Sequence, residues 1–163
     1  MYRSKDFLMM EVVDIKGKKI GFIKDILIDF NKGVVTGFSI SSYSLFHKSV
    51  SISKKDIISF NYKMIIKRSR KEEKLKFFPL KGIDVIDKFG NDIGIMEDIV
   101  FDNITFKING VVVSKGLIRN FINGKKIFLI KELILGEKNI LYYGEDKKMN
   151  FKTMPHDVVG KNR

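Results

Sequence analysis

An internal repeat limits the folds that this chain can adopt. Residues 14–29 recur as residues 87–102 without a gap, and both stretches follow the pattern D-x-x-G-x-x-I-G-x-x-x-D-I-x-x-D. The similarity continues on both sides, so that the two copies cover residues 7–67 and 78–144. A repeat of this kind means that one supersecondary unit occurs twice. We therefore expect the chain to fold as two copies of one small module.

The composition and the periodicity of each copy favour strands. Ala and Gln are absent, whereas Ile, Val and Phe are abundant, and β-branched and aromatic residues fit a pleated sheet better than a helix. Apolar residues alternate with polar ones in residues 34–41 and 50–53, as in strands with one buried side. We predict an all-β fold of two consecutive small antiparallel β-barrels, with few short helices.

Glycines and aspartates recur at matching positions of the two copies. Glycine tolerates the positive φ of tight turns, and an aspartate can accept hydrogen bonds from nearby backbone N–H groups. We interpret these residues as a signature of the fold rather than as chemical groups of an active site. They are Gly17, Gly21, Asp25, Asp29, Gly90, Gly94, Asp98 and Asp102.

The charge distribution separates the two copies. Residues 1–70 carry 14 Lys and Arg against 6 Asp and Glu, whereas residues 71–147 carry 13 against 12. We interpret residues 1–70 as a basic first barrel and residues 78–147 as a nearly neutral second barrel. Residues 71–77 are predicted to be a charged linker between them. Residues 148–163 are predicted to be a flexible polar tail.

The sequence offers little catalytic machinery. It contains no cysteine, which excludes disulfides, thiolate chemistry and cysteine-based metal sites. The two histidines, His47 and His156, have no second histidine at ligand spacing, and the repeated glycines belong to hairpins rather than to a strand-to-helix phosphate loop. We therefore expect no catalytic residue, no metal, no cofactor and no enzyme activity.

The hydrophobicity pattern favours a protein of the cytoplasm. No apolar run approaches the roughly 20 residues that are needed to span a bilayer, and no continuous apolar stretch of a secretory signal follows the first residues. We expect a cytoplasmic protein that does not insert into a membrane.

The repeated pattern resembles a known family. The unit G-x-x-I-G-x-x-x-D-I, followed by an alternating strand and a final Lys-Asp-Ile at residues 55–57 or Lys-Glu-Leu at residues 131–133, is similar to the PRC-barrel domain. That family includes the barrel of the photosynthetic reaction-centre H subunit and the C-terminal domain of a small-subunit ribosome maturation factor. The resemblance implies a bacterial tandem PRC-barrel protein.

The resemblance also implies a function. It favours a non-catalytic adaptor that acts through protein–protein contacts. A ribosome- or RNA-associated factor that uses the basic first barrel is the alternative, although the N-terminal domain found in the maturation factor is absent from this sequence. A sporulation-associated role is a further alternative and rests on family analogy alone.

Basic residues of the first copy form a candidate surface for a polyanion such as RNA. Clustered cations bind phosphates, but lysine outnumbers arginine here, and arginine is the residue that recognises phosphates with two hydrogen bonds. A solvated lysine surface without a ligand stays the simpler interpretation. The candidate residues are Lys16, Lys18, Lys19, Lys54, Lys55, Lys67, Arg68 and Arg70.

One loop of each copy carries large apolar side chains. Such side chains usually close the open end of a small barrel. If exposed, they would instead form a surface for a protein partner or for a homodimer. The candidate residues are Leu45, Phe46, Leu117, Ile118, Phe121 and Ile122.

Overall fold

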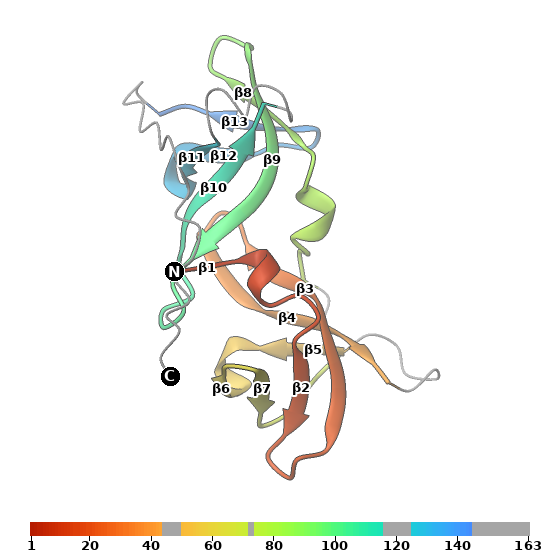
Figure 1. Cartoon of the computed structure of the whole chain (residues 1–163). Helices are drawn as coiled ribbons and strands as arrows, with labels where there is room; N and C mark the ends of the chain where they lie inside the picture. Colours follow the sequence, from red (N-terminus) through yellow and green to blue (C-terminus); the bar gives the residue numbers. More distant parts are fainter. Residues whose placement is uncertain (44–49, 72–73, 116–124, 145–163) are drawn as a thin grey trace.

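The computed structural model describes residues 1–43, 50–71, 74–115 and 125–144. These residues form two β-sheets and four one-turn 3-10 helices, and they contain no α-helix (Figure 1). The all-β class that the sequence predicts is confirmed.

The first sheet is built from residues of the first copy. Its strand order is β5-β4-β3-β2-β7-β6. The strands are β2 (Glu11–Asp14), β3 (Lys19–Asp29), β4 (Val34–Ser42), β5 (Val50–Ser53), β6 (Ile57–Phe60) and β7 (Lys63–Ile66). Two 3-10 helices belong to this half, η1 (Ser4–Asp6) before β2 and η2 (Lys54–Asp56) between β5 and β6.

The second sheet repeats this arrangement. Its strand order is β11-β10-β9-β8-β13-β12, which is the order of the first sheet strand for strand. The strands are β8 (Asp84–Asp87), β9 (Asp92–Phe101), β10 (Ile108–Ser114), β11 (Lys126–Leu129), β12 (Leu133–Leu135) and β13 (Asn139–Tyr142). The 3-10 helices η3 (Phe78–Leu80) and η4 (Ile130–Glu132) take the places of η1 and η2.

Two details differ from the expected antiparallel barrel. In each half one neighbouring pair is parallel, β2 with β7 and β8 with β13. The chain between the members of each pair runs through all the other strands of its sheet, and this long connection lets the two strands point the same way. Among the described residues, each sheet is also an open series of strands rather than a closed ring.

A two-fold relation connects the two halves. Val35 N donates to Phe106 O and Ile108 N donates to Gly33 O, each at 2.8 Å. The repeat offset of 73 residues converts each of these bonds into the other. Val34 pairs with Lys107, its own counterpart in the repeat, between the two bonds. The centre of the pseudo-two-fold relation therefore lies at this pair.

The leading segment of each half crosses to the other half. The short strand β1 (Tyr2–Arg3) pairs with β9 of the second sheet, and in Figure 1 it lies beside that strand. In return, Lys76 pairs with Leu27 of β3. Residues 74–77, which we interpreted as part of a linker, thus contribute backbone bonds to the first half.

One hydrophobic core joins the two sheets. Phe7 is fully buried and stacks on Phe38 of β4 at 5.0 Å and on Phe101 of β9 at 5.4 Å between ring centroids. Phe77 of the crossing segment is buried in the same cluster. Because both halves contribute to a single core, they pack as one body.

Candidate functional site

Two of the repeated aspartates hold the crossing segments. Asp98 lies inside β9 and is 2% exposed. Its carboxylate accepts hydrogen bonds from Arg3 Nε at 2.9 Å, Ser4 N at 3.1 Å and Ile99 N at 2.8 Å. These bonds fix the leading segment of the first half onto the second sheet.

Asp25 does the same for the other half. Its carboxylate lies inside β3, is buried, and accepts hydrogen bonds from Phe78 N at 3.0 Å and from Ile26 N at 2.7 Å. Burial raises the pKa of Asp25, against the lowering effect of these backbone bonds and of the nearby Lys76 charge. Asp25 and Asp98 thus lie within strands rather than in turns, and both bind backbone.

The other two signature aspartates stabilise turns. Asp29 Oδ1 accepts a hydrogen bond from Lys32 N at 3.0 Å, and Asp102 Oδ1 accepts one from Thr105 N at 2.7 Å. These backbone bonds lower the pKa of both carboxyl groups. Their oxygens are engaged by the turns that follow β3 and β9.

The signature glycines mark tight positions of the backbone. A Cβ on Gly21 would lie 2.0 Å from Ser41 O of the adjacent strand, and one on Gly94 would lie 2.4 Å from Ser114 O. Gly17 and Gly90 meet no neighbour but lie in the hairpin turns at φ +78° and +83°, a conformation that favours glycine.

The predicted polyanion surface is partly neutralised. Arg68 Nε lies 2.9 Å from Asp56 Oδ1, and Arg70 Nη2 lies 3.3 Å from Asp56 Oδ2. Asp56 is only 3% exposed, so it holds both guanidinium groups at the edge of the first sheet. Lys19 is paired with Glu11 at 2.9 Å. These three cations of the predicted set are therefore less available to an external ligand.

The other five cations gather at one end of the first sheet. β2 and β7 run in parallel with Asp14 opposite Ile66, so the residues that follow the two strands lie at the same end (Figure 1). Lys67 N also donates to Asp56 O at 2.8 Å, which brings η2 to this end. In the part of the chain that the structure describes, no carboxylate pairs with these exposed lysines. They form the basic end: Lys16, Lys18, Lys54, Lys55 and Lys67.

The predicted partner residues lie outside the described part of the chain. This holds for the apolar loop residues and for both histidines, and the structure therefore does not test them. They are Leu45, Phe46, Leu117, Ile118, Phe121, Ile122, His47 and His156.

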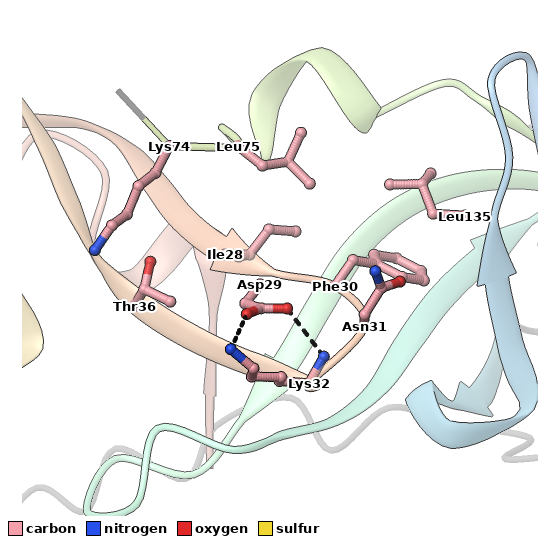
Figure 2. Close-up of a pocket in the computed structure, with 9 residues that line it drawn as sticks. All are labelled: Ile28, Asp29, Phe30, Asn31, Lys32, Thr36, Lys74, Leu75 and Leu135. Carbon is pink, nitrogen blue, oxygen red and sulfur yellow. Dashed lines mark hydrogen bonds and ion pairs between the residues drawn. The ribbon is translucent and has the colours of Figure 1, made fainter. Parts of the chain in front are cut away.

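A pocket of about 530 Å³ opens where the two halves meet (Figure 2). Ile28 of β3, Leu75 of the crossing segment and Leu135 of β12 provide apolar walls, and Asp29 is bonded to Lys32 at one side. This lining combines apolar surface with an ion pair that is already satisfied. The pocket offers no nucleophile paired with a base.

Each sheet also presents an outward side that the sequence patterns did not single out. In β2 and β7, Val12 and Met64 point into the core, so their neighbours point outward. Ile65 lies directly opposite Val13 and Ser59, and the exposed Ile58 precedes Ser59. We name the resulting surface outer face 1. It consists of Glu11, Val13, Lys19, Ile58, Lys63 and Ile65.

The second sheet has the corresponding outer face 2. Ile134 of β12 lies opposite Leu141 of β13, which lies opposite Ile86 of β8. Cross-strand neighbours point to the same side of a sheet, so these three side chains form one continuous apolar row. Ile134 is 52% exposed. Outer face 2 consists of Asp84, Ile86, Asp92, Ile134, Asn139 and Leu141.

The two outer faces differ in charge. In outer face 1, Glu11 accepts ion pairs from Lys63 at 2.7 Å and from Lys19 at 2.9 Å. The bonds from Lys63 and Lys19 lower the pKa of Glu11 to about 2. The repeat places Asp92 and Asn139 where outer face 1 has Lys19 and Lys63. Outer face 2 therefore contains acidic side chains and no cation.

The described residues contain no group of three or more His, Asp or Glu side chains that could hold a metal ion. No helix among them is long and apolar enough to cross a membrane.

A comparison with known families assigns the first half. Residues 1–74 match the family model of the PRC-barrel domain. No curated protein matches the chain. The match covers η1, β2 to β7 and the residues up to the crossing segment, which is the complete first sheet described above. Residues 1–74 therefore form a PRC-barrel domain, a small β-barrel of a non-catalytic fold family whose members often mediate protein interactions.

Proposed function

We propose that this protein is a cytoplasmic, non-catalytic adaptor, built from two PRC-barrels, that binds protein partners through its outer faces. The observation that carries the proposal is the apolar row on the outward side of each sheet. Ile134, Leu141 and Ile86 adjoin one another across three strands, and a contiguous exposed apolar patch rimmed by polar groups is typical of a protein interaction site.

Support for a second barrel comes from the backbone. The second sheet has the strand order of the first. Its register is shifted by the same 73 residues, since Val12 opposite Gly21 in the first sheet corresponds to Val85 opposite Gly94 in the second. We propose residues 78–147 as the second PRC-barrel on this basis.

Support for a binding role rather than catalysis comes from the carboxylates. Asp25, Asp98, Asp29 and Asp102 each accept hydrogen bonds from the backbone. A general acid or base must instead direct a free oxygen at a substrate. The repeated carboxylates are thus committed to holding the fold together.

The proposal is tested by charged substitutions within the row. We expect Ile134→Asp with Leu141→Asp to abolish the recovery of partners by the tagged full-length protein from its own cells, because two buried carboxylates would oppose docking. Ile104→Asp is the matched control, since Ile104 is 82% exposed in the turn after β9 and lies outside both outer faces. Retention of all partners by the double variant would contradict the proposal.

The predicted loop surface is tested in the same assay. We expect Leu117→Ser with Phe121→Ser to weaken partner binding if the loop adds to the interface. Unchanged recovery of partners by this variant would remove the loop from the proposed surface.

RNA binding is a second candidate, favoured by the basic end of the first sheet. Five unpaired lysines can neutralise up to five phosphates, which predicts a slope of about −3.5 for the logarithm of the association constant against that of salt on single-stranded RNA. Filter binding between about 0.05 and 0.3 M salt measures this slope. Reversal of Lys54 and Lys55 to Glu should flatten it, and no binding near physiological salt would exclude the candidate. A sporulation-associated role rests on family analogy alone.

A further inference from the structure

We infer that outer face 1 of one copy of this protein binds outer face 2 of a second copy. The inference rests on the proposed function, because it names the partner of the surfaces proposed there. It follows from the shape, apolarity and charge that the two faces show in one chain.

The two faces have the same apolar framework. The side chains at matching repeat positions are Val13 and Ile86, Ile58 and Ile134, and Ile65 and Leu141. All six lie on the outward sides of strands with the same order and parallel pairing. Two such faces have similar curvature and can bring one apolar row against another, as the packed centre of an interface requires.

The charges around the rows are of opposite sign. Outer face 1 has Lys19 and Lys63 around one acidic group, Glu11, and outer face 2 has Asp84 and Asp92 without a basic group. The Nζ groups of the two lysines point into solvent from side chains that are 64% and 55% exposed. A contact between the unlike faces therefore brings lysines to aspartates.

Contacts between like faces are disfavoured by the same charges. Two copies of outer face 2 would set Asp84 and Asp92 against equal charges, and two copies of outer face 1 would oppose four lysines to two glutamates. Like charges brought together at an interface oppose the wrong pairing. The charge pattern thus selects the pairing of outer face 1 with outer face 2.

This pairing uses a different surface on each copy. A heterologous contact of this kind leaves one outer face free at each end of a dimer, so that it either closes into a ring or extends into a chain. The predicted assemblies of the wild-type protein therefore grow beyond a dimer as the concentration rises.

Sedimentation velocity of the full-length chain tests the inference. The wild type is expected to associate as its concentration rises to about 100 µM. Raising NaCl from about 0.05 M to 0.5 M is expected to weaken association by about tenfold, because salt screens the exposed charges. A wild type that stays monomeric across this range overturns the inference.

Charge reversal makes the test specific. Variant A carries Lys19→Glu and Lys63→Glu, so both of its faces are acidic. Variant B carries Asp84→Lys and Asp92→Asn, where Asn keeps the oxygen that accepts a hydrogen bond from Gly94 N. Each variant alone is expected to be monomeric. An equimolar mixture of the two is expected to associate, because each face again meets an opposite charge.

A matched control uses the double change Lys54→Glu with Lys55→Glu, which alters an exposed lysine pair outside both outer faces. This control is expected to associate like the wild type. Association of variant A alone, or equal loss of association in the control, overturns the inference. If variant A fails the folding check by circular dichroism, variant B tests the same contact from the opposite side.

The two proposals fail in different ways. Cellular partners that are lost on Ile134→Asp with Leu141→Asp, together with a wild type that is monomeric, overturn the self-association and leave the proposed function intact. Self-association that requires both outer faces, with no other protein bound there, supports the inference and contradicts an adaptor role between different proteins.

Discussion

Replacing Asp98 by Ala removes the carboxylate that ties the start of the chain to the second sheet. The substitution leaves three donors without their acceptor, Arg3 Nε, Ser4 N and Ile99 N. Ser4 is buried, whereas the Arg3 side chain is 20% exposed. The amide nitrogens therefore have little access to water, and the guanidinium can recover part of its hydration.

These contacts set the size of the effect. A buried donor that loses its partner costs about 1–3 kcal/mol, and breaking a buried ion pair costs about 3–5 kcal/mol. Because Arg3 stays partly hydrated, we expect the lower part of this range. Asp98→Ala should lower the free energy of unfolding by about 3 kcal/mol.

Urea denaturation, followed by circular dichroism and by tyrosine fluorescence, measures this change. Coincident transitions from the two probes would support a two-state analysis. Asp84→Ala is the control, because Asp84 is exposed and should change the stability by less than about 0.5 kcal/mol. A cost below about 1 kcal/mol for Asp98→Ala would refute our account of how the leading segment is held.

Three further predictions concern the junction and the hairpins. Burial raises the pKa of Asp25 above its ordinary value of 3.8, so its ionised form opposes folding; the unfolding free energy of wild type should fall as pH rises through the window above 3.8, and Asp25→Asn should reduce that fall in urea titrations. Val34→Cys with Lys107→Cys should form an intramolecular disulfide, seen as faster migration on a non-reducing gel, because directly opposed positions of this type lie about 4.5 Å apart; a reduced product under mild oxidation would contradict the pseudo-two-fold pairing. Gly21→Ala should cost about 1–3 kcal/mol, because its Cβ would overlap Ser41 O, and an unchanged thermal midpoint would argue against that close approach.

The sequence was sufficient to predict the local structure. The pattern shared by residues 14–29 and 87–102 corresponds to a hairpin in each half, formed by β2 with β3 and by β8 with β9. Turn residues and alternation are local signals, and these strands are neighbours along the chain. Asp25 and Asp98 were also recognised as structural residues, although their place inside strands was not foreseen.

Long-range pairing could not be predicted from such signals. Nothing in Tyr2 and Arg3 indicates a partner about a hundred residues away, and Phe77 was hidden in a segment whose charges suggested a linker. The apolar Phe77 was the one signal that the segment packs against a core. Similarly, the pairing of Arg68 with the buried Asp56 depends on the strand register that brings η2 beside the end of β7.

The outer faces were missed for a related reason. Alternation in Lys63, Met64, Ile65 and Ile66 shows that two sides exist, but both sides carry apolar residues. Only the parallel pairing of β7 with β2 reveals which residues face the core. A strand with isoleucine on both sides is a signal that could have pointed to an exposed apolar surface.

The central claim is that the protein works by binding other proteins through its outer faces. Photo-crosslinking in cells of origin tests it most directly, with a photoreactive phenylalanine analogue placed in turn at positions 134, 65 and 104. We predict crosslinks to protein from Ile134 and Ile65, and none from the exposed control position Ile104. Crosslinks that are absent from both outer faces, or that arise equally from Ile104, would contradict the account.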